Sequence, residues 1–258
     1  LQRASRTLVW ARFELFTLAF TRFQLLGRIY QRGCERRLER EVPDPDLRRK
    51  LVPDFPLGCK RVLISNEWYP TLQRPDVSLV TEPISQIRAD SVVTVDGAEH
   101  PADVLIFGTG FASKQFLAPM EVRGRGGREL NEAWRDGAEA YLGITVAGFP
   151  NMFLLYGPNT NLGAGSIVYM LESQIDYVVE AIRALRRERA AWMDVRPDVQ
   201  SSFNEDIQGR LAESVWTAGC TSWYRTESGK VTNNWPGFTY EYRRLTREPD
   251  LEDFELAR

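Results

Sequence analysis

The chain has 258 residues, with 33 Lys+Arg against 35 Asp+Glu, three cysteines and one histidine. This length is enough for one large domain or two small ones, and 43% hydrophobic with 26% charged residues is an ordinary globular composition. The single histidine, His100, excludes a multi-histidine metal site, and a Ser–His–Asp triad would have to use it. We therefore expect chemistry carried by a cofactor or by Arg, Lys and carboxylate groups.

The distribution of charge and the use of cysteine indicate possible partners and the redox compartment of the protein. Residues 1–61 hold 14 Lys+Arg and 7 Asp+Glu, whereas the rest of the chain is acidic. The basic segment could meet a phosphate-bearing ligand, an anionic membrane or an acidic partner, or could be a solvated helix face. Cys34, Cys59 and Cys220 are scattered and never in CxxC spacing. A disulfide framework or zinc ribbon is therefore not expected, and a reducing, cytoplasmic location is favoured.

The chain is expected to begin with a helix that extends from Leu1 to about Glu41. Charged residues interrupt its apolar stretch, so it is too short to span a membrane. One apolar stripe recurs every three or four residues, which is typical of an amphipathic helix: Val9, Phe13, Phe16, Phe20, Phe23, Leu26 and Tyr30. We expect this face to pack against protein, with peripheral membrane contact through residues 8–30 as the alternative.

Asp44 before Pro45 predicts a short helix through Leu51. After it, short β-branched runs predict strands, with a hairpin turn at Asp96-Gly97 and another strand further along the chain. These runs are residues 60–65, 77–80, 91–95, 102–107 and 150–158.

The last hundred residues are expected to be mainly helical. A polar, glycine-rich loop leads into a long helix whose predicted inner face is Ile167, Met170, Leu171, Ile175, Val178, Val179 and Ile182. Residues 199–216 predict a second helix, and the aromatic, turn-rich residues 220–245 predict a lid or packing segment. The acidic tail from residue 247 is expected to fray.

Three segments carry possible chemistry. Gly108-Thr109-Gly110 follows a strand, where glycine lets the backbone approach a ligand, although a tight turn explains it as well. The loop around Asn161 precedes a helix, whose free N–H groups suit anionic oxygens, although Asn161 could simply cap that helix. In Lys60-Arg61, a fixed guanidinium could hold an anionic intermediate, although the pair could also be surface charge.

Together, in this order and spacing, these segments resemble the C-terminal half of the class B flavoprotein monooxygenases. The similarity is to the Baeyer–Villiger group that includes 4-hydroxyacetophenone and phenylacetone monooxygenases, and it covers roughly residues 40–245. The similar stretches are GCKRVLISNEWYPTLQRPDVSLVTEPI, DVLIFGTGF, YLGITVAGFPNMFLLYGPNTNLG and CTSWYRTESGKVTNNWPGFTYEYRR. The glycine-rich loops and the histidine signature of that family are absent from these residues, which favours a C-terminal portion of a longer protein.

The resemblance implies an α/β fold, that of an incomplete flavoprotein with two FAD/NAD(P)-binding Rossmann-like domains, long helices and short strands. Residues 1–55 would be a helical segment of the NADP domain, and residues 56–101 would be its end with linker strands. Residues 102–190 would be the C-terminal part of the FAD domain, and residues 191–258 a helical and aromatic lid.

The resemblance also implies a reaction. Such enzymes use FAD and NADPH to insert one oxygen atom from O2 into a ketone through a C4a-peroxyflavin, so the partners would be a small organic molecule and O2, without nucleic acid. Oxygenation of nitrogen or sulfur is the alternative, as is a non-catalytic remnant that binds a membrane or a protein.

Site residues follow from the same resemblance. Arg61 matches an active-site arginine that supports the oxygenated flavin and the nicotinamide, and Lys60 is a weaker candidate beside it. Trp223 matches a tryptophan that contacts NADP. The remaining matches are to cofactor-binding positions: Thr109, Gly110 and Phe111 in the segment that returns to the FAD domain, and Asn161 and Leu162 where the loop meets the flavin ring.

Overall fold

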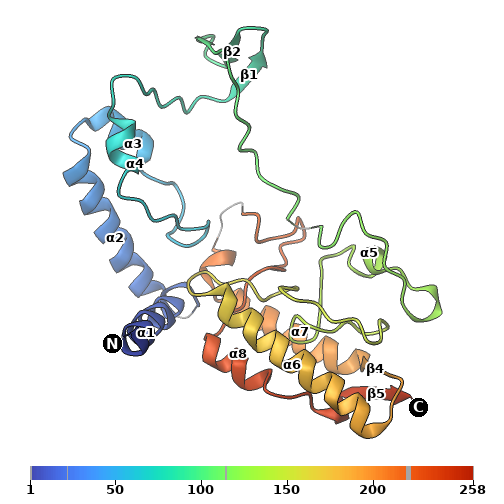
Figure 1. Ribbon diagram of the computed structural model, residues 1–258. Coiled ribbons are helices and arrows are strands. Elements are labelled where there is room, and N and C mark those ends of the chain that lie inside the picture. The colour runs from blue at the N-terminus through green and yellow to red at the C-terminus, as the bar shows by residue number, and fades with distance from the viewer. Residues whose placement is uncertain (1, 22, 114, 219–221, 258) are drawn as a thin grey trace. The chain divides into compact units, whose positions relative to one another are not determined.

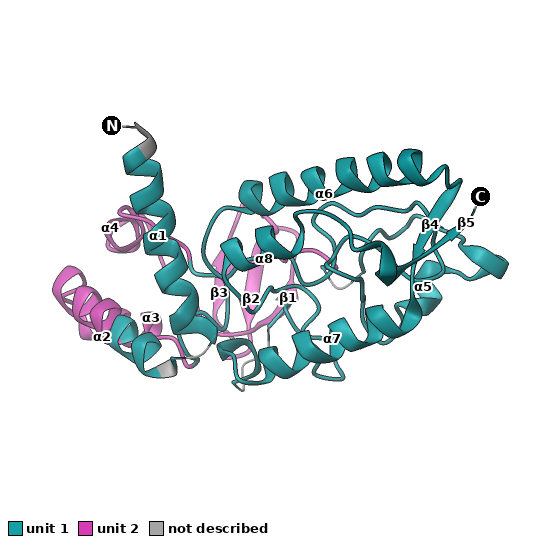
Figure 2. Cartoon of the chain, turned by 90° about the horizontal axis from the view of Figure 1, so that it is seen from below, with its two compact units in different colours: residues 1–31, 55–62, 113–258 teal, residues 32–54, 63–112 magenta. Residues whose placement is uncertain are grey.

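A computed structural model describes residues 2–21, 23–113, 115–218 and 222–257, apart from the side chains of Gln2, Arg3 and Gln24 (Figure 1). The chain divides into two compact units, which Figure 2 distinguishes by colour. Unit 1 consists of Leu1–Gln31, Phe55–Val62 and Ser113–Arg258, and unit 2 consists of Arg32–Asp54 and Leu63–Ala112. The fold is α/β, with long helices and short strands.

The leading segment forms two helices rather than the single one expected. Helix α1 is Gln2–Thr21 and α2 is Gln24–Glu41. They are separate because the N–H of Phe23 donates to the carbonyl of Leu18, five residues back (2.8 Å), which interrupts the regular ladder. Within the described residues, no helix is long and apolar enough to cross a membrane.

The expected short helix is confirmed as α3, Pro45–Leu51. A carboxylate oxygen of Asp44 accepts a hydrogen bond from the N–H of Asp46 (2.9 Å), and proline stands at the first helical position. This cap satisfies one of the free N–H groups at the helix start. A further short helix, α4, is Trp68–Leu72.

Unit 2 contains an antiparallel three-stranded sheet in the order β1-β2-β3. Its strands are Ile84–Ile87, Ser91–Thr94 and Glu99–Pro101. The expected hairpin is confirmed, since β2 pairs with β3 across a turn in which Gly97 has a φ of 84°. That left-handed conformation explains why glycine stands there.

Four of the expected strands are wrong. Residues 60–65, 77–80, 102–107 and 150–158 have no regular secondary structure. The apolar side chains of two of these runs lie in solvent: Leu63, Ile64, Ile106 and Phe107 are 82%, 87%, 93% and 70% exposed. A buried strand of an α/β sheet needs strands beside it and helices over both faces. The described residues provide neither for these runs, so the β-branched sequence remains extended and unpaired.

Besides α1 and the start of α2, unit 1 contains three further main helices and an antiparallel strand pair, which the two ribbon views show (Figures 1 and 2). The helices are α6, Ile167–Glu188, α7, Pro197–Ala212, and α8, Thr239–Leu245, and the pair is β4, Trp192–Val195, with β5, Phe254–Ala257. Shorter elements complete it: η1 (Arg125–Gly127), α5 (Leu130–Ala133), η2 (Val215–Thr217) and η3 (Leu251–Asp253).

Aromatic side chains from the last forty residues form the centre of unit 1. Trp216, Tyr224, Trp235 and Tyr242 are at most 2% exposed and cluster with apolar side chains of α6 and α7. Rings of this size contribute much of the apolar area that folding buries. The packing role expected of residues 220–245 is therefore confirmed for residues 222–245. Residues 220 and 221 lie outside the described part of the chain.

The inner face predicted for α6 is only partly right. Ile175, Val179 and Ile182 are 48%, 40% and 48% exposed. The side chains that α6 buries are instead Met170, Ser173, Gln174, Tyr177, Ala181 and Ala184. Polar side chains can lie inward here because they have partners: the amide of Gln174, for example, donates to the Tyr242 hydroxyl (2.9 Å).

The expectation that the acidic tail frays is wrong. Residues 254–257 form β5, which pairs with β4 in antiparallel register from Val195↔Phe254 to Trp192↔Ala257. Phe254 is 6% exposed and packs into an apolar cluster with Met193 and Val195. Burial of this ring and the strand hydrogen bonds hold the tail in spite of its charge.

The cysteines differ from expectation at one position. Cys34 is a free, exposed thiol, as expected for a reduced chain. Cys59 is fully buried and disulfide-bonded. The sequence did not predict this disulfide bond, because the spacing of cysteines along the chain does not show which segments folding brings together.

A buried carboxylate joins α1 to α8. The side chain of Glu14, 8% exposed, accepts hydrogen bonds from the backbone N–H (3.2 Å) and the hydroxyl of Thr239, the first residue of α8. The indole of Trp10 donates to the same hydroxyl oxygen (3.0 Å). Burial raises the pKa of Glu14 above its usual value, although the hydrogen bonds from Thr239 and Trp10 lower it.

This raised pKa predicts how stability depends on pH. A carboxyl whose pKa is higher in the folded than in the unfolded chain contributes stability below the unfolded pKa, and the contribution is lost as pH rises through the folded pKa. The free energy of unfolding of the wild type, minus that of Glu14→Gln, should therefore fall as pH rises from 4 to 7. Urea unfolding at several pH values measures this difference, with the exposed-site variant Glu213→Gln as control for the change in charge. A difference that grows with pH would contradict the assignment.

Candidate functional site

Arg61 lies in an exposed, extended segment directly after the buried Cys59. Its positive charge acts on two phenols of unit 1, where it lowers the pKa of Tyr156 and of Tyr224. Burial is the larger effect and raises the pKa of both hydroxyls. Tyr156 and Tyr224, which were not predicted as site residues, are thus the two phenols on which the charge of Arg61 acts.

Lys60, the neighbouring candidate, has a different environment. Its ammonium lies 4.2 Å from the centre of the Phe55 ring, a cation–π contact within its own segment. Lys60 therefore differs from Arg61, whose charge acts on Tyr156 and Tyr224.

Asn161 is held in a polar network on the same side of unit 1. The hydroxyl of Tyr156 donates to its side-chain oxygen (2.7 Å), and its side-chain N–H donates to the side-chain oxygen of Asn234 (2.5 Å). Its backbone forms a parallel bridge with Asn234. Asn161 is therefore not the cap of the following helix, since α6 begins at Ile167 with Ser166 as its N-cap.

The start of α6 has free N–H groups. The side chain of Ser166 makes no capping hydrogen bond, and the first turn contains no acidic residue among those described. The positive end of this 22-residue helix is thus not compensated locally, which suits a ligand oxygen that carries negative charge. Leu162, just before it, is 8% exposed and its side chain belongs to the aromatic core cluster.

Trp223 lies beside Tyr224. Its ring centre is 4.2 Å from that of Tyr224, and it is 38% exposed, so one part of the indole remains accessible. The hydroxyl of Ser113 donates to its carbonyl (3.5 Å). Unit 1 therefore contains two contact pairs of interest: Tyr156 with Asn161, and Trp223 with Tyr224.

Three predicted cofactor-binding residues belong to the other unit. Thr109, Gly110 and Phe111 lie in an irregular, exposed segment of unit 2, where Gly110 has a φ of 88° and Phe111 is 99% exposed. The sequence signal that selected them was an apolar run before two glycines. The three residues belong to unit 2, whereas the network built around Asn161 belongs to unit 1.

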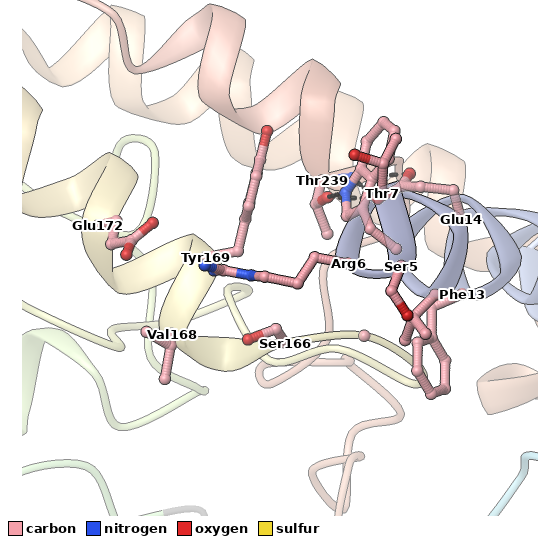
Figure 3. A pocket seen from close by; sticks show the side chains of 13 residues that line it. Ser5, Arg6, Thr7, Phe13, Glu14, Ser166, Val168, Tyr169, Glu172 and Thr239 are labelled. Carbon is pink, nitrogen blue, oxygen red and sulfur yellow. Dashed lines mark hydrogen bonds between the residues drawn. The ribbon is translucent and has the colours of Figure 1, made fainter. Parts of the chain in front are cut away.

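A cavity of about 1050 Å³ lies between α1 and the start of α6 (Figure 3). Aromatic rings form part of its wall: Trp10 stacks on Tyr169 with ring centres 6.4 Å apart, and Phe13 lies at one end. The side chain of Arg6 extends across it towards Tyr169, and the carboxylate of Glu14 lies at the α8 end. A concave space of this size with aromatic and a few polar groups suits an organic molecule.

Comparison with known proteins shows to which proteins this chain is similar. No family model matches the chain. A Baeyer–Villiger monooxygenase of Pseudomonas aeruginosa is 41% identical over 258 residues, which is 99% of this chain and 49% of that protein. A Baeyer–Villiger monooxygenase of Streptomyces coelicolor is 41% identical over 256 residues, which is 98% of this chain and 49% of that protein.

Solved structures agree as well. A steroid monooxygenase in its oxidized form bound to NADP has a TM-score of 0.81 and 28% identity, with 93% of this chain matching 47% of that one. A cyclohexanone monooxygenase from Rhodococcus sp. Phi1 bound to NADP+ has a TM-score of 0.80 and 25% identity, with 93% of this chain matching 46% of that one.

The fold is thus that of part of a flavoprotein monooxygenase. The two curated relatives that match almost all of the chain are named Baeyer–Villiger monooxygenases. The chain spans about half the length of the curated relatives it matches.

The charge of Arg61 makes a prediction that needs no ligand. Arg61→Met, which removes the positive charge, should raise the pKa of Tyr156 and Tyr224, because a nearby cation stabilises phenolate. Alkaline titration followed by absorbance at 295 nm measures this, and the same titration in a Tyr156→Phe background identifies the share of Tyr224. Arg61→Lys is the control that retains the charge. Identical titration curves for the wild type and Arg61→Met would show that the guanidinium does not face these phenols.

Proposed function

We propose that this chain forms part of an FAD- and NADPH-dependent monooxygenase that inserts one oxygen atom of O2 into a small ketone. The observation that carries the proposal is the hydrogen bond between Tyr156 and Asn161, with the charge of Arg61 acting on Tyr156, in a chain 41% identical to a Baeyer–Villiger monooxygenase. Oxygenation at nitrogen or sulfur is the alternative, and amine and sulfide substrates in the same assay distinguish it.

The residues present fit the flavin. The uncapped start of α6 offers N–H donors and a positive helix end to the polar edge of the ring, and Asn161 lies in the loop that leads to it. When bound, FAD supplies the redox chemistry, accepting hydride from NADPH and activating O2. The half-exposed indole of Trp223 offers a flat surface on which a nicotinamide can stack.

Arg61 has the properties required to stabilise negative charge on oxygen. Its guanidinium stays protonated at any working pH and offers several donors. Within the described residues it forms no ion pair with a carboxylate, so its charge is not neutralised by the protein. A positioned donor of this kind contributes about 3–4 kcal/mol to catalysis in comparable sites.

The cavity between α1 and α6 is proposed to admit the organic substrate. Its volume of about 1050 Å³ exceeds that of a small ketone, and Trp10, Phe13 and Tyr169 supply apolar surface against which such a molecule can pack. The hydroxyl of Ser166 supplies a donor for a carbonyl oxygen. The lining therefore suits a hydrophobic molecule with one polar group.

The unpaired apolar runs fit the same proposal. Residues 62–64 and 104–107 are strand-forming sequences that lie exposed. We propose that they are strands of dinucleotide-binding sheets to which further polypeptide contributes the neighbouring strands. In that arrangement residues 1–55 and 56–101 belong to the NADP domain and its linker, residues 102–190 to the FAD domain, and residues 191–258 to a lid.

The proposal is tested in a chimera in which this chain replaces the matched segment of the Pseudomonas aeruginosa relative. The chimera should bind FAD, oxidise NADPH and convert a ketone to an ester. In it, Arg61→Ala should leave flavin reduction intact but lower ester formation about 10²- to 10³-fold, since a charge-stabilising donor is lost. Absorbance of the flavin and chromatography of the product measure these two steps.

Lys60→Ala is the matched control, because it removes the adjacent charge without touching the tyrosine pair. A colourless wild-type chimera that does not oxidise NADPH in the presence of FAD would refute the enzyme function. Ester formation that persists in Arg61→Ala would refute only the role of the arginine.

Trp223→Ala should raise the KM for NADPH several-fold and leave the FAD content unchanged, because the substitution removes a stacking surface and not a flavin contact. Steady-state kinetics and the ratio of flavin to protein absorbance measure the two quantities. Trp68→Ala, at an exposed site of α4, is the control for loss of an indole. Equal loss of NADPH use and of flavin would indicate misfolding rather than a binding role.

A further inference from the structure

Tyr156 is held in a backbone conformation that residues other than glycine rarely adopt. Its φ is 60°, in the left-handed region. Its N–H donates to the side-chain oxygen of Gln174 on α6 (2.8 Å), and the amide of Gln174 donates to the hydroxyl of Tyr242 on α8 (2.9 Å). Gln174 and Tyr242 are both fully buried. A strained residue persists only where its surroundings overdetermine it, and such residues cluster at functional sites.

A hydrogen bond also fixes the side chain of Tyr156. An amide oxygen can only accept, so the phenol must donate its proton to Asn161 (2.7 Å). This bond determines which way the amide of Asn161 points, and its N–H then meets the oxygen of the buried Asn234 (2.5 Å). Because its proton is donated to Asn161, the phenolic oxygen can form a further hydrogen bond only as an acceptor.

The position of Tyr156 joins two candidate site residues. Asn161 lies on one side of its hydroxyl, and the charge of Arg61 acts on the same oxygen from another element of unit 1. The ring is 43% exposed, so it borders the accessible face and not the core. No other tyrosine among the described residues donates its hydroxyl to Asn161.

We propose that Tyr156 is a positioning residue of the oxygenase site: its hydroxyl orients the amide of Asn161 through the hydrogen bond between them. The effect on oxygenation rests on the proposed function. The hydrogen bond between Tyr156 and Asn161 does not depend on that function and can be tested separately.

The structural link is tested in the chain as it is. Tyr156→Phe removes one oxygen and keeps the ring. Introduced into the wild type, this substitution should lower the midpoint of urea unfolding. Introduced into Asn161→Ala, in which the hydrogen-bond acceptor is already absent, it should leave the midpoint unchanged. Tyr240→Phe is the control, since its ring is 51% exposed and stacks on Phe238 outside the network. Equal shifts of the midpoint in both backgrounds would overturn the proposal.

The chemical consequence is tested in the chimera. Tyr156→Phe should retain its FAD and its KM for NADPH, while the share of NADPH oxidation that yields ester falls about tenfold and the visible spectrum of the flavin shifts. A purely structural role would lower FAD content and turnover together, and an unchanged ester yield would refute positioning. If the wild-type chimera binds no flavin, the proposed function fails, and the urea experiment still decides whether Tyr156 orients Asn161.

Discussion

Unit 1 depends on the parallel pairing of residues 159–161 with residues 231–235. The N–H groups of Asn159 and Asn161 donate to the carbonyls of Thr232 and Asn233, and the N–H of Trp235 donates to the carbonyl of Asn161, each at 2.8 Å. The side chain of Asn159 adds bonds to the carbonyls of Val231 (2.8 Å) and Asn234 (3.1 Å). Buried backbone groups must be paired, and this contact pairs two loops that have no other secondary structure.

The consequences of this pairing reach the site. It places Trp235 in the aromatic core and sets Asn161 opposite Asn234, which leaves the side chain of Asn161 available to Tyr156. The same loop then leads through Ser166 into α6, whose Gln174 holds the backbone of Tyr156. The core and the candidate site are therefore built from the same hydrogen bonds, and disturbance of either is expected to affect both.

Buried polar groups of unit 1 contrast with exposed apolar side chains of unit 2. In unit 1, Gln174 and Asn161 are hydrogen-bonded, whereas in unit 2 Ile64, Ile106 and Phe111 are at least 87% exposed. Large apolar surfaces of this kind mark contact sites. The exposed stripe of α6, with Ile175, Val179 and Ile182, belongs to the same pattern, since a helix face with this sequence is ordinarily covered.

Much of the local structure was predictable because its causes are local. The N-cap Asp44, the turn at Gly97 and the helices α6 and α7 depend on neighbouring residues and on periodicity, and all were anticipated. The strand runs and the tail were not, since a strand is defined by its partner and not by its own residues. The site was half predictable: motif resemblance selected Arg61, Asn161 and Trp223, but Tyr156 is an ordinary aromatic residue of an apolar run until folding places it beside Asn161.

The amino-acid sequence by itself determined the class of the protein, through motifs whose order and spacing resemble one family, and it determined the helices, whose hydrogen bonds close within a few residues. Only the tertiary structure decided which polar groups are buried together, that the acidic tail pairs as β5 with β4, and that Tyr156 donates a hydrogen bond to Asn161. The physical reason is that a hydrogen bond or a strand ladder between residues far apart in the chain depends on the position of both partners. The residues next to one partner in the chain do not determine where the other partner lies.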